Sequence, residues 1–115
     1  MMVGGDAEPE LGVVVGTTTF STRALERLAV GLARDAGRVS ASDVSVRLAD
    51  DRGALRVAVS MPLAVVVGSR RTIVDDGDAV RRRLIDGMRG LAGRTVAAVD
   101  LRYTGVRRIA ERRVR

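Results

Sequence analysis

The stretch from Val44 to Met61, VSVRLADDRGALRVAVSM, decides the fold, because it contains two runs in which apolar and polar residues alternate. This period of two is typical of a strand with one buried and one exposed face. Residues 49–53, between the runs, form a compact turn sequence containing Asp and Gly. We therefore predict an antiparallel hairpin of two half-buried strands. Pro62, which follows, cannot donate to a ladder and so indicates an edge, a bulge or the strand end.

An amphipathic helix is predicted before the hairpin. Ser21 has the side chain of an N-cap, and Gly37 provides a stop because glycine readily adopts the left-handed conformation at a helix C-terminus. Apolar residues recur between them at helical spacing. The expected core face contains Leu25, Leu28, Ala29, Leu32 and Ala36.

A second helix is predicted after the hairpin, beyond a mostly polar connection over residues 68–73. Its cap is expected among Asp75, Asp76 and Asp78, and Gly93 ends it. Gly87 and Gly90 each weaken a helix by up to about 1 kcal/mol, a cost that close packing against a sheet could offset. The expected core face contains Val80, Leu84, Met88 and Leu91.

Two outer strands complete the prediction. Residues 13–20 are β-branched at six of eight positions, and residues 99–104 alternate apolar and polar side chains. The order is β-α-β-β-α-β, which predicts an α+β fold: a two-layer sandwich with a mostly antiparallel sheet and two helices on one face. The other face is open to solvent or a partner. We expect a disordered tail over residues 1–10, one domain over 11–106, and a basic tail or short helix over 107–115.

The composition excludes several classes of chemistry. The chain has no Cys and no His, so disulfides, cysteine nucleophiles, histidine acid/base schemes and the usual zinc sites are ruled out. The carboxylates at 50 and 51 fall in the predicted turn, and those at 75, 76 and 78 suit helix capping better than calcium. We expect no catalytic, cofactor or metal residues. The longest apolar run, residues 63–67, is too short to span a bilayer, and no secretory signal is recognisable. We expect a cytoplasmic protein.

The net charge of +6 points to an acidic or anionic partner. The net charge is weaker evidence for such a partner than its size suggests, because every basic residue is Arg, a bias that a GC-rich genome also produces. Arg70 and Arg71 could converge with residues 81–83 on phosphate or an acidic partner, although a solvated helix face is the plainer interpretation. Residues 94–115 hold seven Arg against two acidic residues. The candidate partner-binding residues are Arg70, Arg71, Arg107, Arg108, Arg112, Arg113 and Arg115.

Three kinds of target fit the basic C-terminal residues: anionic lipid, acidic protein and RNA. In residues 106–115 an apolar stripe could lie beside the arginines, as in a basic amphipathic helix. Binding of single-stranded nucleic acid normally uses several aromatic side chains, and this chain has only Phe20 and Tyr103. An RNA- or DNA-binding module is therefore the second hypothesis, and an enzyme is the third.

Two motifs carry a resemblance to a known family. Residues 11–21, LGVVVGTTTFS, followed by the spacing of apolar residues over 24–33, resemble the opening of the alkaline shock protein family, also called the envelope stress response family. Residues 80–106, which end in AAVDLRYTGV, resemble its closing helix and strand. The chain departs from the family pattern over residues 61–74, where members have an acidic, Asn-Pro-containing segment, and in being basic.

This resemblance implies a non-enzymatic cytoplasmic protein of Gram-positive bacteria, here a small, basic, actinobacterial member. It implies a role in cell-envelope homeostasis and a place at the inner face of the membrane, where an anchoring protein partner holds the molecule. It also implies self-association into homo-oligomers. No catalytic residues and no cofactors come with it.

Overall fold

The hairpin predicted from residues 44–61 forms the centre of the structure, a computed structural model that describes residues 20–109. Strand β1 (Ser45–Asp51) pairs antiparallel with strand β2 (Ala54–Val66). The turn between them is shorter than expected: Arg52 and Gly53 have φ values of 54° and 87°. Two successive residues with positive φ make a type I′ turn, whose twist matches that of the strands it joins.

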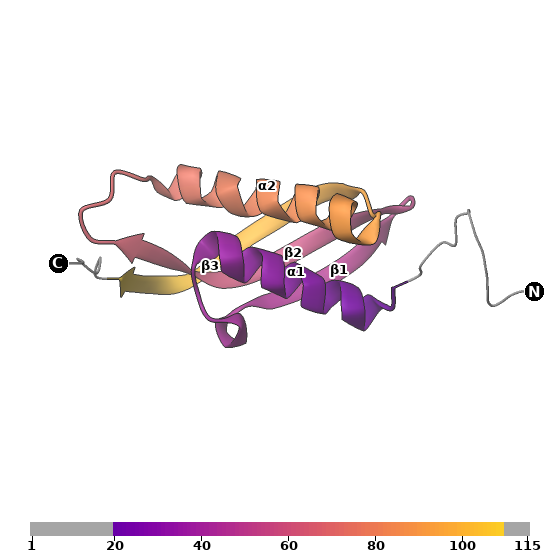
Figure 1. The fold of residues 1–115 in the computed structure, drawn as a ribbon, viewed down its shortest axis with the longest axis horizontal. Coiled ribbons are helices and arrows are strands. Elements are labelled where there is room, and N and C mark those ends of the chain that lie inside the picture. The colour runs from indigo at the N-terminus through magenta and orange to yellow at the C-terminus, as the bar shows by residue number, and fades with distance from the viewer. Residues whose placement is uncertain (1–19, 110–115) are drawn as a thin grey trace, which may run out of the picture.

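The described chain is α+β, with a three-stranded mixed sheet and two helices (Figure 1). Helix α1 (Thr22–Gly37) and a 3-10 turn, η1 (Ala41–Asp43), precede the hairpin. Helix α2 (Ile73–Ala92) and strand β3 (Val96–Ile109) follow it. The expected first strand, residues 13–20, lies outside the described residues except for Phe20, which belongs to no strand.

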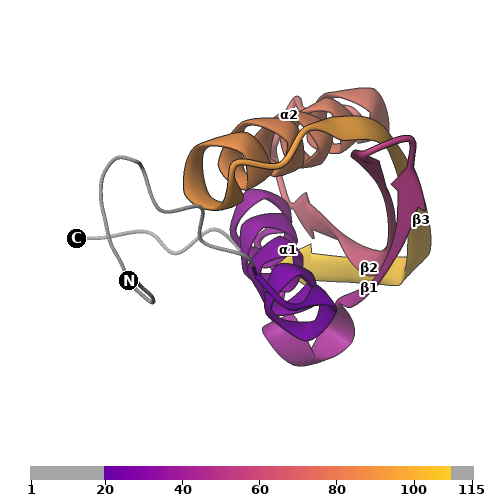
Figure 2. The ribbon, with the colours of Figure 1, turned by 90° about the vertical axis from the view of Figure 1, so that its right-hand side faces the viewer.

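The sheet order is β1-β2-β3, and β3 runs parallel to β2. The prediction of a mostly antiparallel sheet is therefore wrong for the described strands. The reason is the connection: α2 carries the chain back to the end of the sheet where β2 begins, so that the next strand runs in the same direction. Figure 2 shows both helices on the same side of the curved sheet.

Pro62 marks a β-bulge inside β2, since the pairing with β3 shifts between Met61 and Leu63. β2 does not end there but continues to Val66. The pairing with β1 stops at Ser60, so beyond the bulge β3 is the one described neighbour of β2. β3 itself extends to Ile109, three residues past the domain boundary expected at 106, because it follows this extension of β2.

The core lies between the two helices and one face of the sheet. On β2 the side chains of Val57, Val59 and Met61 are at most 1% exposed, and Leu84 and Met88 of α2 are fully buried. The helix faces agree largely with the prediction: Leu25, Ala29 and Leu32 are buried, whereas Leu28 and Ala36 are half-buried.

Leu91 was predicted to be in the core and is 62% exposed. The buried row of α2 proceeds in steps of four from Val80 through Leu84 and Met88 to Ala92, which packs against the core cluster. Leu91 precedes Ala92 and so points about 100° away from that row.

The helix ends differ from the prediction in two places. Ser21 caps α1 as expected, but the left-handed residue at its C-terminus is Arg38, with a φ of 56°, and not Gly37. A side chain at Gly37 would clash with Met61. The N-cap of α2 is Thr72; Asp75 completes a capping box with it and is not the cap itself. Gly87 allows close packing, because a Cβ there would collide with Leu32, whereas Gly90 faces open space.

The contrast between Leu84 and Leu91 gives a matched test of the core. Leu84→Ala should lower the free energy of unfolding by about 2–5 kcal/mol, because it leaves a cavity at a fully buried site. Leu91→Ala should change it by less than about 0.5 kcal/mol. Leu28→Ala, at a half-buried site, should fall between them. Urea denaturation measures all three, and equal losses for Leu84→Ala and Leu91→Ala would contradict the placement of α2.

Candidate functional site: the open face of the sheet

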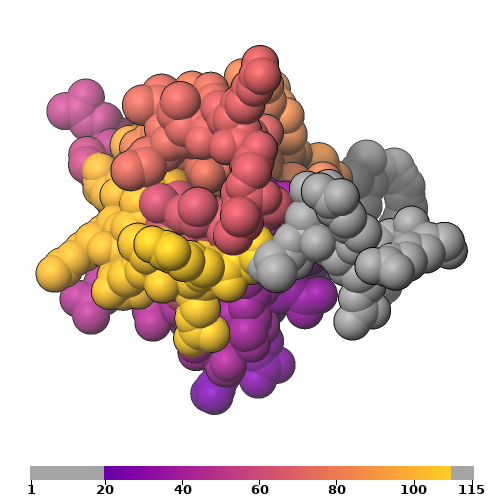
Figure 3. Space-filling view, turned by 90° about the vertical axis from the view of Figure 1, so that its left-hand side faces the viewer, coloured from indigo at the N-terminus to yellow at the C-terminus, as the bar shows by residue number. Residues whose placement is uncertain are grey.

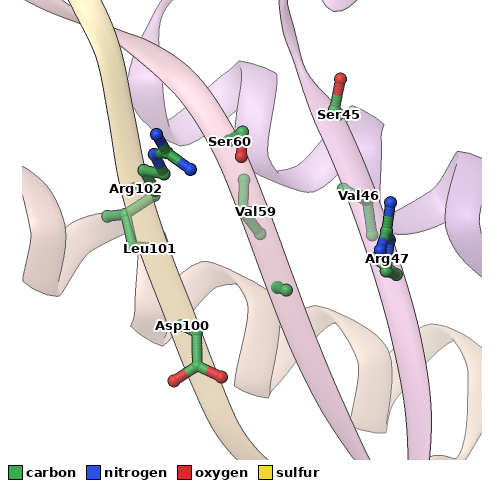
Figure 4. Close-up of a pocket in the computed structure, with 9 residues that line it drawn as sticks. Ser45, Val46, Arg47, Val59, Ser60, Asp100, Leu101 and Arg102 are labelled. Carbon is green, nitrogen blue, oxygen red and sulfur yellow. The ribbon is translucent and has the colours of Figure 1, made fainter.

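The face of the sheet that points away from the helices is hollowed at its centre. The hollow is a shallow depression of about 490 Å³ to which all three strands contribute. Figure 4 shows its lining side chains, including Arg102 on β3, Ser60 on β2 and Arg47 on β1. We call this surface the open face; it is lined by Ser45, Arg47, Ala49, Arg56, Ala58, Ser60, Ala98, Asp100 and Arg102.

Strand pairing arranges the open face in three cross-strand rows. Going from β1 through β2 to β3, one row is Ser45, Ser60 and Arg102. The next row is Arg47, Ala58 and Asp100. The third is Ala49, Arg56 and Ala98. Each row has one arginine, each on a different strand, and the small side chains of Ala58 and Ser60 form a low floor between the outer strands.

The charges on the open face are only partly matched. Nη2 of Arg56 lies 3.4 Å from Oδ2 of Asp100. Both side chains are at least half exposed, so this pair contributes little to stability. Over residues 20–109, Arg47 and Arg102 have no carboxylate within ion-pair distance. Two guanidinium groups therefore flank the floor of the depression without a described partner, and they can bind carboxylate or phosphate oxygens.

The open face contains no described aromatic side chain. Tyr103, the only tyrosine, follows Arg102 and points to the opposite side of the sheet, where it packs against the core cluster beside Gly77. Its hydroxyl is buried and has no hydrogen-bond partner among the described residues. Base stacking, the usual means by which a sheet binds single-stranded nucleic acid, thus has no platform on this surface.

The arginines predicted from the sequence lie elsewhere, at the end of the molecule where β2 and β3 finish (Figure 3). Arg70 and Arg71 belong to the loop between β2 and α2, and Arg107 and Arg108 pair with Ala64 and Val65. The structure therefore brings these four to one end. Arg112, Arg113 and Arg115 lie outside the described residues.

Carboxylates of the same chain bind two of these arginines, Arg71 and Arg107. Nε of Arg71 donates to Asp76 at 2.8 Å, which raises the pKa of the guanidinium, and Arg107 lies 2.9 Å from Asp43. Arg81 pairs loosely with Asp78, and Arg83 pairs loosely with Asp35 on α1. The backbone and hydroxyl hydrogen bonds of Thr72 lower the pKa of Asp75, as expected for a capping-box carboxylate.

No protein-family model, no curated protein and no solved structure matches the chain. Residues 20–109 contain no group of three or more acidic residues placed to hold a metal ion. None of the helices in this range is long and apolar enough to cross a membrane.

Sequence reasoning placed Arg47, Arg56 and Arg102 on the polar sides of their strands but did not select them as candidates. The alternation was a sufficient signal for their common face. What it could not give was the register, which decides that the three arginines occupy successive rows. It also could not show that Asp100 forms its ion pair with Arg56.

Tyr103 provides a direct test of the packing beside the open face. Burial, followed by the nearby Asp76 carboxylate, raises the pKa of its phenol above the ordinary 10.0. The folded state therefore favours the neutral phenol. This contribution to stability is complete below pH 10 and is lost as the pH rises through the folded-state pKa.

Because the chain has one Tyr and no Trp, phenolate absorbance reports this residue alone. We expect the native midpoint above 10 and the midpoint in denaturant near 10. Stability should fall less above pH 10 in Tyr103→Phe than in the parent chain. A native midpoint at or below 10 would show that the hydroxyl is solvated.

Proposed function

We propose that this chain is a non-enzymatic interaction module that binds an acidic segment of a membrane-associated protein through its open face. The observation that carries the proposal is the pair Arg47 and Arg102, which flank the low floor of Ala58 and Ser60 without a described carboxylate partner. Arginine is well suited to this role because its planar fork can bind a carboxylate with two parallel hydrogen bonds.

The shape of the open face supports a protein partner of extended form. The depression runs across three strands and is shallow, unlike the deep, mostly apolar pockets that enclose small molecules. A segment with two acidic side chains could place one carboxylate against each arginine. Their strands are separated by β2 and their rows are offset by two residues, so the two Cα positions are roughly 12 Å apart.

The wider setting of this proposal follows from the family resemblance. We propose the six-element order β-α-β-β-α-β in two layers, a cytoplasmic location at the inner face of the membrane, a role in the envelope stress response, and self-association. The helices cover one side of the sheet and leave the other available, which is the arrangement that a docking module of this kind requires (Figure 2).

An RNA- or DNA-binding module is the second candidate, and the three arginines of the open face favour it. The lack of a described aromatic side chain on that face counts against it, because only phosphate contacts would remain. Such contacts bind without sequence preference and weaken steeply as salt rises.

The open face can be tested with a matched set of arginine variants. Arg47→Ala combined with Arg102→Ala should reduce recovery of the partner from detergent-solubilised membranes of the source cells at least ten-fold, because two charge-assisted contacts are lost. Arg23→Ala combined with Arg27→Ala changes the charge equally on exposed positions of α1 and should leave recovery unchanged. Quantitative mass spectrometry of the captured proteins gives the ratio.

Two outcomes would contradict the proposal. Equal losses for both pairs would mean that binding follows net charge and not the open face. The second candidate would be supported instead if Arg47→Ala with Arg102→Ala lost a bound nucleic acid and no protein. In that case the logarithm of the binding constant should fall linearly with the logarithm of the salt concentration.

A further inference from the structure

A second surface, at the end of the molecule where β2 passes into α2, combines exposed apolar side chains with arginines. Four aliphatic side chains project there: Val65, Val67, Ile73 and Val74 are 39%, 61%, 61% and 68% exposed. We call this surface the β2–α2 end, made of Val65, Val67, Arg70, Ile73, Val74 and Arg108. It lies at the left of Figure 1 and faces the viewer in Figure 3.

The parts of the β2–α2 end are held next to one another by described contacts. The N–H of Val67 donates to the carbonyl oxygen of Ile109 at 3.1 Å, which fixes the start of the loop to the end of β3. The N–H of Ser69 donates to the carbonyl oxygen of Val66 at 3.0 Å and turns the loop back. Val65 and Ile73 both line one small hollow. The apolar side chains are therefore presented by a fixed turn and a capped helix end.

The acidic groups near this end are already bound. Asp76 accepts from Arg71 at 2.8 Å, and Asp75 accepts from the N–H of Thr72 at 3.0 Å within the capping box. Arg70 and Arg108 have no carboxylate within ion-pair distance among residues 20–109. The arginines at this end outnumber the carboxylates by one: Arg70, Arg71 and Arg108 against Asp75 and Asp76. The N-terminus of α2 adds the positive end of its helix dipole. The surroundings of the apolar side chains are thus cationic.

This combination fits a lipid surface better than a protein one. Val67 and Val74 project from a loop and a helix end, and the hollow that Val65 and Ile73 line is small, about 50 Å³. Aliphatic side chains beside basic ones are the features of interfacial membrane contacts, where partial insertion and attraction to anionic headgroups act together.

We propose that the β2–α2 end inserts Val67, Ile73 and Val74 into the headgroup boundary of an anionic membrane, with Arg70 and Arg108 against lipid phosphates. The open face runs along the sheet away from this end, so a molecule attached in this way keeps the open face available to a membrane-associated partner. The inference goes beyond the proposed function and does not depend on it, because lipid binding here requires none of the open-face arginines.

Vesicle co-sedimentation with the full chain tests this inference. The probes are phosphatidylcholine vesicles with and without 30 mol% phosphatidylglycerol. The chain should bind only the anionic vesicles, and binding should weaken as salt rises. Val67→Ser, Ile73→Ser and Val74→Ser together should lower the partition coefficient at least ten-fold. Arg70→Ala and Arg108→Ala should each lower it roughly five-fold.

Matched controls separate this surface from general properties of the chain. Ile85→Ser with Leu91→Ser removes exposed apolar side chains from α2 away from the end and should leave the partition coefficient unchanged. Arg89→Ala, on the same helix, is the control for charge. Circular dichroism of each variant confirms that it is folded. The arginines beyond Ile109 are present in every variant, so they cancel in the comparison.

Each remaining outcome overturns the inference. Equal binding of the triple serine variant and its control would mean that charge alone attracts the chain to vesicles. Release of the chain from vesicles by millimolar inorganic phosphate would indicate a simple phosphate site. Binding to single-stranded RNA that competes with vesicles and does not depend on the apolar residues would assign this end to nucleic acid.

Discussion

The packing of one side of β2 against the two helices is the contact on which the rest of the structure depends. Val57, Val59 and Met61 are buried in the same cluster as Leu32 of α1 and Leu84 and Met88 of α2. Since successive side chains of a strand point to opposite faces, burying these three forces Arg56, Ala58 and Ser60 to the other side. The open face is thus the direct consequence of the core and needs no separate explanation.

The same strand also positions the second surface. β2 continues past the bulge at Pro62, beyond its pairing with β1, and carries β3 with it to Ile109. The loop to α2 therefore begins at a projecting end of the sheet, where aliphatic side chains are exposed and Arg108 lies on the neighbouring strand. One long central strand with a bulge accounts for an open face along the sheet and an apolar, basic end beyond it.

The sequence was most informative where a simple period governs the structure. The alternation in residues 44–61 predicted the hairpin, and the four-residue steps of Val80, Leu84 and Met88 predicted the buried row of α2. It failed for Leu91, because spacings of three and four both suit a helix face and only tertiary packing chooses between Leu91 and Ala92. It also failed for the C-terminus of α1, where the left-handed residue is Arg38 and Gly37 instead lies against the end of the Met61 side chain, a contact distant in sequence.

The candidate sites were less predictable than the fold. Arg70, Arg71, Arg107 and Arg108 were recognisable as charge runs, yet their meeting at one end depends on the parallel register of β2 and β3. The parallel pairing itself was missed, because alternation specifies which face a residue occupies and says nothing of strand direction. The arginines of the open face are isolated in sequence, so only the register could bring them together.

The central claim is that β2 has one side sealed by helices and one side available to a partner. The chain has no Cys, so single variants on adjacent β2 positions can be labelled with a maleimide in the full-length native protein. Ala58→Cys, on the open face, should react close to the rate of an unfolded thiol. Val59→Cys, at a position that is 1% exposed, should react more slowly than Ala58→Cys by a factor of at least roughly one hundred, since labelling requires local opening. Equal protection of the two variants would mean that the open face is covered and would contradict the account.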